Sequence, residues 1–171
     1  MTNAYIIDAC RTPRGIGKVG KGALAHLHPQ HLAATVLKAI ADRNGLDTAT
    51  VDDIIWGTSS QRGAQSCDLG RMAALDAGYD IKASGVTLDR FCGSGITTVN
   101  LAAAQIMSGM EDCVIAGGTE MMSYTAATAD LTAPPMLDAG NKSLREKHPQ
   151  SQQGVCADAI ATLEGIDREA V

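Results

Sequence analysis

The sequence predicts an α/β fold in which a largely parallel sheet carries helices on both faces. Short apolar runs alternate with longer stretches of helical spacing, and the connections between them are short. The 171 residues include 18 glycines for turns, and 45% of them are hydrophobic, which is enough for a sizeable core. Strands and helices that alternate in this way form parallel sheets, because each helix carries the chain back across a face of the sheet.

The first part of the chain contains a predicted strand, a loop and a helix. Residues 4–9, AYIIDA, are a short apolar run that predicts a strand. Residues 11–22 follow as a glycine-rich, basic loop. Residues 30–44 predict a helix that ends at Gly45, because apolar side chains recur there at helical spacing. These side chains are Leu32, Val36, Leu37 and Ile40.

The alternation continues through the next elements. Residues 51–57, VDDIIWG, predict a second strand. Residues 67–78 predict a helix that Gly78 closes, and residues 84–88 predict a brief third strand. Each of these segments lies a few residues from the next, as is typical of strand–helix–strand units.

The helix that follows Cys92 and the strand after it are both strongly apolar. One stripe of the helix carries Ile96, Val99, Ala103, Ile106 and Met110, and its opposite side is also mostly apolar. A helix that is apolar nearly all round is usually buried, so we expect this one to be covered on both sides. Residues 113–118, CVIAGG, predict the fourth strand, and its glycines are expected to form a tight turn at its carboxyl end.

The character of the sequence changes after Tyr124. Residues 125–150 contain three prolines and show weak periodicity, which indicates an excursion from the core. Residues 151–165 recover helical character, and Asp167 is placed to cap the first turn of a further helix. We therefore predict a first domain over residues 1–124 and an incomplete second domain over residues 125–171. The chain is expected to be the front part of a longer protein.

Charge and composition exclude several classes of partner. The net charge is −5 and the basic residues form no block, so we expect no nucleic-acid partner and no membrane. No apolar run reaches the roughly 20 residues of a membrane span, and the first residues lack the pattern of a signal peptide. Five cysteines at unrelated spacings indicate free thiols in a reducing compartment. We therefore expect a cytoplasmic protein.

Cys92 is the strongest candidate for chemistry. It stands between a short strand and the start of a long helix, in the sequence FCGSG. Unpaired backbone N–H groups and the helix dipole at this position favour a thiolate, which is the nucleophilic form of cysteine. Gly93 and Gly95 leave room for an acyl group beside the sulfur, as acyl transfer through a covalent intermediate requires. The alternative is a buried cysteine with a structural role.

Three further patterns carry less weight. Residues 15–20, GIGKVG, match a dinucleotide-binding fingerprint, but Pro29 delays the helix that should follow at once, so a loop is the better interpretation. His26, His28 and His31 lack a fourth metal ligand at a suitable spacing, which favours surface histidines at a helix entry. Glu120 is a possible acid or base, although a single glutamate in a turn is more often structural.

Several of these segments resemble the thiolases, the acetyl-CoA acyltransferases of the Claisen-condensing superfamily. FCGSG together with AGGTEMMS at residues 116–123 carries the resemblance most specifically. Residues 8–25 resemble the N-terminal signature of the family, and residues 63–78 resemble the segment before its active-site strand. QGVCADAIA at residues 153–161 resembles the family's M-G-x-x-A-E-x-x-A helix.

The resemblance implies a fold and a role for Cys92. The chain would be the first half of a duplicated thiolase fold plus the start of a loop domain. Cys92 would accept the acyl group from a 3-ketoacyl-CoA, and its backbone N–H would be one oxyanion donor. Gly93 and Gly95 would lie against the substrate. Asp89 stands where the family usually has asparagine, and Phe91 replaces a smaller valine, which bears on subclass and substrate.

The resemblance also implies what lies outside these residues. The substrates would be acyl-CoA and CoA, with no cofactor and no metal. A histidine and a second cysteine of the catalytic machinery would come from a C-terminal half, so residues 1–171 alone should be inactive. The intact enzyme would be a homodimer or homotetramer. The alternative from a different class is a non-catalytic truncated module that packs with a partner chain.

Overall fold

The computed structural model describes residues 3–129 and 137–171. The chain divides into two compact units, and the division along the sequence falls between Ala129 and Asp130. The first unit contains α1 (Pro29–Asn44), β1 (Asp53–Gly57), α2 (Leu69–Asp76), β2 (Val86–Leu88), α3 (Ser94–Ser108), β3 (Val114–Gly118) and α4 (Met122–Ala127), with single 3-10 turns at Thr48–Thr50 and Gly63–Gln65. The second unit contains α5 (Lys142–Lys147) and α6 (Gln153–Glu164).

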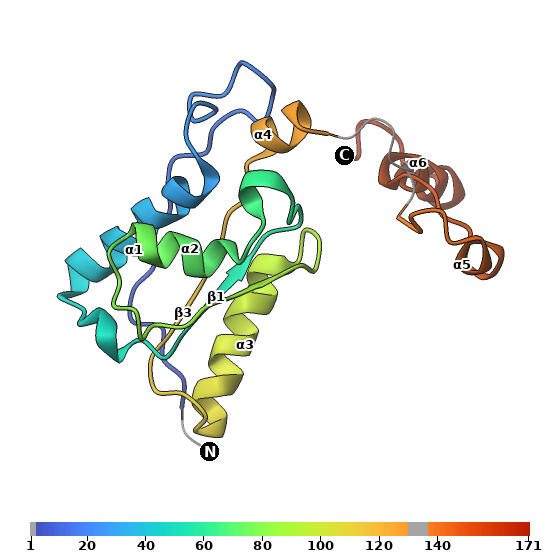
Figure 1. The fold of residues 1–171 in the computed structure, drawn as a ribbon. Coiled ribbons are helices and arrows are strands. Elements are labelled where there is room, and N and C mark those ends of the chain that lie inside the picture. The colour runs from blue at the N-terminus through green and yellow to red at the C-terminus, as the bar shows by residue number, and fades with distance from the viewer. Residues whose placement is uncertain (1–2, 130–136) are drawn as a thin grey trace. The chain divides into compact units, whose positions relative to one another are not determined.

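The described strands form one parallel sheet in the order β2-β1-β3. Ile55 at the centre of β1 pairs with Val86 on one side and with Ala116 on the other. Figure 1 shows α1 and α2 side by side on one face of this sheet, with α3 along the other. The α/β class with a parallel sheet and helices on both faces is therefore confirmed.

The core lies between the sheet and the pair α1 and α2. Ile54 and Trp56 point into it from β1, and they meet Leu37 of α1 and Leu69 of α2. Trp56 is 2% exposed. A methyl group added at Gly117 on β3 would overlap three atoms of the Trp56 ring, the farthest of them at 2.9 Å. Gly117 therefore makes room for the indole, and burying that ring is a large part of the hydrophobic stabilisation of this unit.

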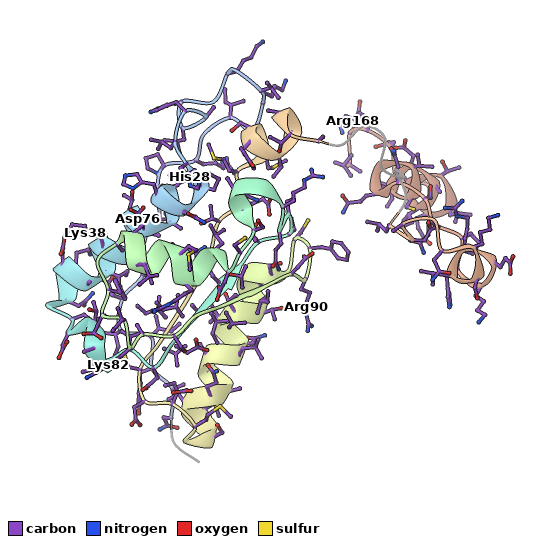
Figure 2. All side chains as sticks on the ribbon, in the orientation of Figure 1. His28, Lys38, Asp76, Lys82, Arg90 and Arg168 are labelled. Carbon is purple, nitrogen blue, oxygen red and sulfur yellow. The ribbon has the colours of Figure 1, made fainter. Side chains whose placement is uncertain are left out.

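Helix α1 begins and ends as its sequence predicts. The side chain of His28 accepts a hydrogen bond from the backbone N–H of Gln30, and Pro29 occupies the first helical position, where a missing N–H costs nothing. Gly45 ends the helix with φ of 55°, a left-handed conformation that glycine adopts without steric penalty. His28 thus has a capping role at the entry of α1 (Figure 2).

The strand predicted at residues 4–9 is wrong. These residues form no regular structure, and the side chains of Ile6 and Ile7 are 83% and 84% exposed. In the described residues the sheet ends at β2 and β3, and residues 4–9 join neither of these edge strands. The observed order of elements therefore begins with α1, whereas the predicted order begins with a strand.

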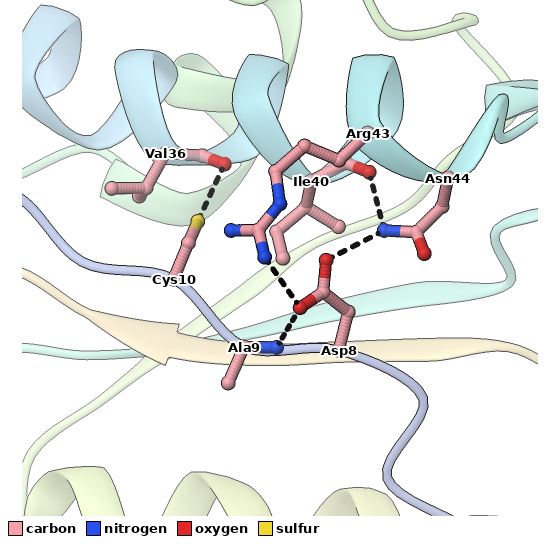
Figure 3. Close-up of polar contacts among 7 residues, drawn as sticks. All are labelled: Asp8, Ala9, Cys10, Val36, Ile40, Arg43 and Asn44. Atoms are coloured by element: carbon pink, nitrogen blue, oxygen red, sulfur yellow. Dashed lines mark hydrogen bonds and ion pairs between the residues drawn. The ribbon is translucent and has the colours of Figure 1, made fainter.

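Polar side chains hold the N-terminal segment against α1 instead (Figure 3). The Asp8 carboxylate accepts hydrogen bonds from Asn44 at 2.9 Å, from the N–H of Ala9 at 2.7 Å and from Arg43 at 3.0 Å. The Asn44 bond, followed by the Ala9 bond, lowers the pKa of Asp8 below its usual value. The Cys10 thiol donates to the carbonyl oxygen of Val36. The segment is thus fixed through its side chains, although its backbone joins no sheet.

Helix α3 is not buried within this chain. Its only buried residues are Ser94 and Thr98, while Ile96, Val99 and Leu101 are exposed. The sheet covers one side of the helix, and nothing in residues 3–129 covers the other. The glycines Gly117 and Gly118 lie inside β3 and do not form the predicted turn.

In the second unit, a polar contact joins Asp138 to Arg145 of α5. The buried carboxylate of Asp138 accepts two hydrogen bonds from Arg145, at 2.6 and 2.7 Å, and one from the N–H of Gly140. Helix α6 confirms the helical character predicted for residues 151–165. Asp167 accepts from the N–H groups of Glu169 and Ala170 as an N-cap does, but residues 166–171 form only a turn.

The predicted boundary after residue 124 falls inside α4, whereas the two compact units meet after residue 129. The predicted excursion at residues 125–150 includes residues 130–136, which lie outside the described residues. That residues 125–171 open a loop domain stays a prediction.

Candidate active site

Cys92 lies in the connection between β2, which ends at Leu88, and α3, which begins at Ser94. Its side chain is exposed. The connection leaves the carboxyl end of a parallel strand, which is where open parallel sheets place their ligands. Figure 2 labels Arg90 on this connection, at the surface of the first unit. A strand, a tight turn and a helix thus present the thiol to solvent at the edge of the sheet.

The turn that holds Cys92 has an unusual backbone. Phe91 has φ of 48°, in the left-handed region that residues with a side chain seldom adopt. The Asp89 carboxylate accepts a hydrogen bond of 2.6 Å from the N–H of Phe91, and the N–H of Gly93 donates to the carbonyl oxygen of Arg90 at 3.0 Å. The Phe91 side chain is 62% exposed and stands beside the thiol in sequence.

The start of α3 lacks a side-chain cap. Gly93 is the N-cap residue and makes no capping hydrogen bond. Within residues 3–129, the N–H groups of Gly95 and Ile96 have no hydrogen-bond partner. Free N–H groups at the positive end of a helix are favourable for an anion, so this end of α3 can receive the oxyanion of an acyl group or a thiolate.

The two predicted substrate-binding glycines differ in their surroundings. A methyl group at Gly95 would meet nothing within 4 Å, so this glycine faces open space. A methyl group at Gly93 would lie 3.3 Å from the carbonyl oxygen of Arg90, a tight approach inside the turn. Gly93 therefore has an internal packing reason to be glycine, whereas the structure gives Gly95 no such reason.

Cys92 is one of two exposed thiols that lie close to a helix start in the described residues. Cys67 is also exposed and also lies two residues before a helix, α2. The two helix starts differ in charge, because the Asp68 carboxylate caps α2 and accepts hydrogen bonds from the N–H of Arg71 and the hydroxyl of Thr87. A carboxylate already occupies the site at α2 that an anion would take at α3.

The remaining thiols have other settings. Cys10 and Cys113 are partly buried, and Cys156 is exposed on α6. Burial, followed by the nearby charge of Asp52, raises the pKa of the Cys113 thiol. A raised pKa leaves Cys113 protonated near neutral pH, which makes it a poor nucleophile.

Glu120 organises a polar network that the sequence did not reveal. Its Oε2 accepts from the hydroxyl of Thr58 at 3.1 Å and from the N–H and the hydroxyl of Ser59 at 2.7 and 2.8 Å. Its Oε1 accepts from Gln65 at 3.2 Å, and the Gln65 amide oxygen accepts from the N–H of Met121 at 2.7 Å. The network joins the loop after β1 to the residues that follow β3.

The network also decides the protonation state of Glu120. Burial by itself would raise the pKa of Glu120, but the hydrogen bonds from Ser59 and Gln65 outweigh it and lower the pKa below its usual value. An ionised carboxylate with four donors is an acceptor and not a general acid, which favours the structural interpretation of Glu120. The signal available in the sequence was the run of polar residues directly after β1, where strand ends meet.

A cavity of about 1390 Å³ lies between the N-terminal segment, α1, α3 and β3. Apolar side chains of two helices line much of it, among them Val36, Ile40, Val99 and Ile106. Cys92, Gly93 and Gly95 do not belong to its lining. The candidate nucleophile therefore opens to solvent elsewhere on the unit.

The other predicted patterns bring no site together. Residues 15–20 form a loop that opens no helix, as the loop interpretation predicts. His31 pairs with Asp76 at the surface, at 2.9 Å. Within residues 3–129 and 137–171, no three or more metal-binding side chains gather into a group able to hold an ion. No helix in those same residues is both long and apolar enough to cross a membrane.

Comparison with known families defines the class of this protein. Residues 4–171 match the family model described as thiolase, N-terminal domain, so the chain belongs to the thiolase family. The resemblance seen in the sequence is therefore confirmed.

Individual relatives give a finer picture. A steroid 3-ketoacyl-CoA thiolase of Mycobacterium tuberculosis is 42% identical over 77% of this chain and 32% of its own length. A 3-ketoacyl-CoA thiolase of Bacillus subtilis is 33% identical over 99% of this chain and 42% of its own length. The crystal structure of the Bacillus anthracis acetyl-CoA acetyltransferase superposes with a TM-score of 0.62, at 39% identity, over 69% of this chain and 29% of that one. The chain thus spans 32–42% of the length of these curated relatives.

Proposed function

We propose that Cys92 is the acyl-accepting nucleophile of a thiolase in which this chain forms the N-terminal part. The thiol sulfur attacks the C3 carbonyl of a 3-ketoacyl-CoA, the bond between C2 and C3 breaks, and acetyl-CoA leaves after its C2 carbon takes up a proton. The sulfur of CoA then attacks the acyl thioester and frees Cys92. The reverse sequence is a condensation.

The exposed position of Cys92 at an uncapped helix start carries the proposal. An acyl thioester needs a thiol that substrate can reach, and Cys92 is exposed. Its tetrahedral intermediate needs N–H donors, and the start of α3 offers free ones beside Gly93. Open space at Gly95 supports the approach of a bulky thioester.

The rest of the catalytic apparatus is proposed to lie outside this chain. A base from the remaining part of the enzyme would take the proton of the Cys92 thiol, and a second cysteine there would serve the C2 carbon. The substrates are 3-ketoacyl-CoA and CoA, and no cofactor or metal takes part. The intact enzyme is expected to be a cytoplasmic homodimer or homotetramer.

Replacement of Cys92 in the intact enzyme tests this proposal. Cys92→Ser should fold but lose thiolysis of a 3-ketoacyl-CoA, because an alkoxide forms far less readily than a thiolate near neutral pH. Cys67→Ser is the matched control, since Cys67 is also exposed and also precedes a helix by two residues. We expect the control to keep its thiolysis rate.

Circular dichroism on both variants separates loss of chemistry from loss of folding. Substantial thiolysis by a folded Cys92→Ser variant would exclude the covalent role of Cys92. That result would place the nucleophile of the enzyme on another residue.

A further inference from the structure

The hydroxyl of Ser94 bonds to two backbone groups of the turn that precedes Cys92. It accepts a hydrogen bond of 2.8 Å from the N–H of Arg90 and donates one of 2.7 Å to the carbonyl oxygen of Phe91. The backbone N–H of Ser94 donates to the same carbonyl at 3.2 Å. Ser94 is 6% exposed, so these bonds are shielded from competing water. The residue just before Cys92 is therefore held from inside the first turn of α3.

The turn needs to be held, because its backbone is strained. Phe91 has φ of 48°, and the left-handed conformation is unfavourable for a residue that carries a side chain. Such a conformation persists only where the surroundings fix it. The two Ser94 donors to the Phe91 carbonyl and the Asp89 acceptor for the Phe91 N–H are the groups that do so.

Ser94 is in turn fixed by the end of β1. A methyl group added at Gly57 would lie 3.0 Å from the Ser94 Cβ and 3.1 Å from its carbonyl carbon. The missing side chain at Gly57 lets the first turn of α3 sit directly on the last residue of the strand. The position of Ser94, and through it that of the turn, is thus set by the sheet itself.

We propose that Ser94 is a positioning residue for Cys92: its hydroxyl holds the strained turn at Phe91 and so fixes where the thiol stands relative to the start of α3. Ser94 touches neither substrate nor the sulfur in this mechanism. The inference deepens the proposed function and rests on it for its consequence in catalysis. Its structural content, that Ser94 controls the reactivity of the Cys92 thiol, is open to a separate measurement.

Thr98 supplies a matched control for a change at Ser94. Thr98 is buried in the same helix, and its hydroxyl donates to the carbonyl oxygen three residues earlier, that of Gly95, at 2.8 Å. Ser94 makes the same type of bond to Phe91. The Thr98 bond lies within α3 and not in the connection that carries Cys92. Ser94→Ala and Thr98→Val therefore each delete one buried hydroxyl, but only the first releases the turn.

The experiment measures the rate at which iodoacetamide alkylates Cys92 in the intact enzyme, followed by peptide mass mapping. Cys67 in the same molecules is the internal reference for exposed thiols. We expect Ser94→Ala to change the Cys92 rate, relative to Cys67, by about tenfold, since small misplacements of a reacting group have effects of this order or more. Thr98→Val should leave the ratio of the two rates within about twofold.

Thiolysis kinetics add a measurement that would not change in this way if Ser94 had only a structural role. Ser94→Ala should lower kcat by about tenfold with the KM for CoA nearly unchanged, because the missing contact acts on the nucleophile and not on substrate binding. Ser94→Thr keeps the hydroxyl and should retain most of the wild-type kcat. It also keeps the test decisive if the alanine variant does not fold.

Equal Cys92 alkylation rates in Ser94→Ala and Thr98→Val would overturn the positioning role. A threonine variant as impaired as the alanine variant would overturn it as well, since the hydroxyl would then not be the cause. These outcomes leave the acyl-acceptor role of Cys92 untouched. Conversely, an active Cys92→Ser enzyme would remove the proposed function, while the alkylation ratio would still report on Ser94.

Discussion

Replacing Gly117 with alanine should destabilise the first unit strongly, because the space for a side chain at this position of β3 is filled by Trp56. The added methyl group would overlap three atoms of the indole ring, at up to 2.9 Å. The ring has little freedom to withdraw, since Trp56 is 2% exposed and its N–H donates to the hydroxyl of Thr119 at 3.0 Å. Trp56 lies in the central strand β1, and the neighbouring strands β2 and β3 fix its backbone from both sides.

The size of the effect has a lower and an upper limit. Overpacking of a filled core costs roughly 1–3 kcal/mol when the neighbours adjust. If the indole is expelled instead, the loss of about 150–250 Å² of buried surface at about 25 cal/mol per Å² costs roughly 4–6 kcal/mol. We therefore expect Gly117→Ala to lower the free energy of unfolding by about 2–5 kcal/mol, between these limits.

Urea unfolding of the intact enzyme, followed by circular dichroism, measures this change. With a slope of about 1–3 kcal/mol per molar urea, the midpoint should fall by about 1–2 M. Gly95→Ala is the control, since a methyl group there meets open space and alanine favours a helix over glycine. Its midpoint should be unchanged or slightly higher. A Gly117→Ala midpoint within about 0.3 M of the wild type would refute the packing argument.

Two further predictions concern the Glu120 network and the exposed faces of the chain. Glu120→Gln should lower the free energy of unfolding by about 1 kcal/mol at neutral pH. A hydrogen bond to a charged group contributes more than this only when it is fully buried. Because the folded pKa of Glu120 lies below its usual value, the contribution is present above the pKa of the unfolded chain and is lost as the pH falls through the folded pKa. The urea midpoints of the two proteins should therefore converge in acid, and a constant difference between them would contradict this prediction. Residues 1–171 alone should self-associate, because Ile6, Ile96 and Leu101 are exposed. They should also lack thiolysis, because the base and the second cysteine are proposed to lie outside these residues. A monodisperse, active monomer by size-exclusion chromatography would contradict this expectation.

The sequence was sufficient for elements whose signals are local. The helix at residues 30–44 has apolar spacing, a proline at its start and a glycine at its end, and α1 has these bounds to within one residue. The prediction of a strand at residues 4–9 failed because an apolar run does not reveal whether its backbone pairs with a sheet. The prediction that α3 is buried failed for a related reason. The apolar pattern shows that a helix needs cover, but it does not show whether this chain supplies that cover.

The candidate site was predictable only in part. The motif around Cys92 gave its place between a strand and a helix, which the structure bears out. The difference between Cys92 and Cys67 depends on the Asp68 cap, for which the local sequence offers an aspartate directly before α2. The Ser94 contacts and the Glu120 network depend on which strand ends meet in space. Such juxtapositions come from the topology of the sheet and leave no pattern along the chain.

The central claim is that Cys92 accepts the acyl group, and the site of acylation tests it most directly. The intact enzyme would be incubated with a short acyl-CoA without free CoA, quenched in acid and mapped by peptide mass spectrometry, with attention to the five thiols of this chain. The account predicts the acyl label chiefly on Cys92, because its helix start is uncapped and its thiol is exposed. A label chiefly on Cys67 or Cys156, the other exposed thiols, would contradict the account.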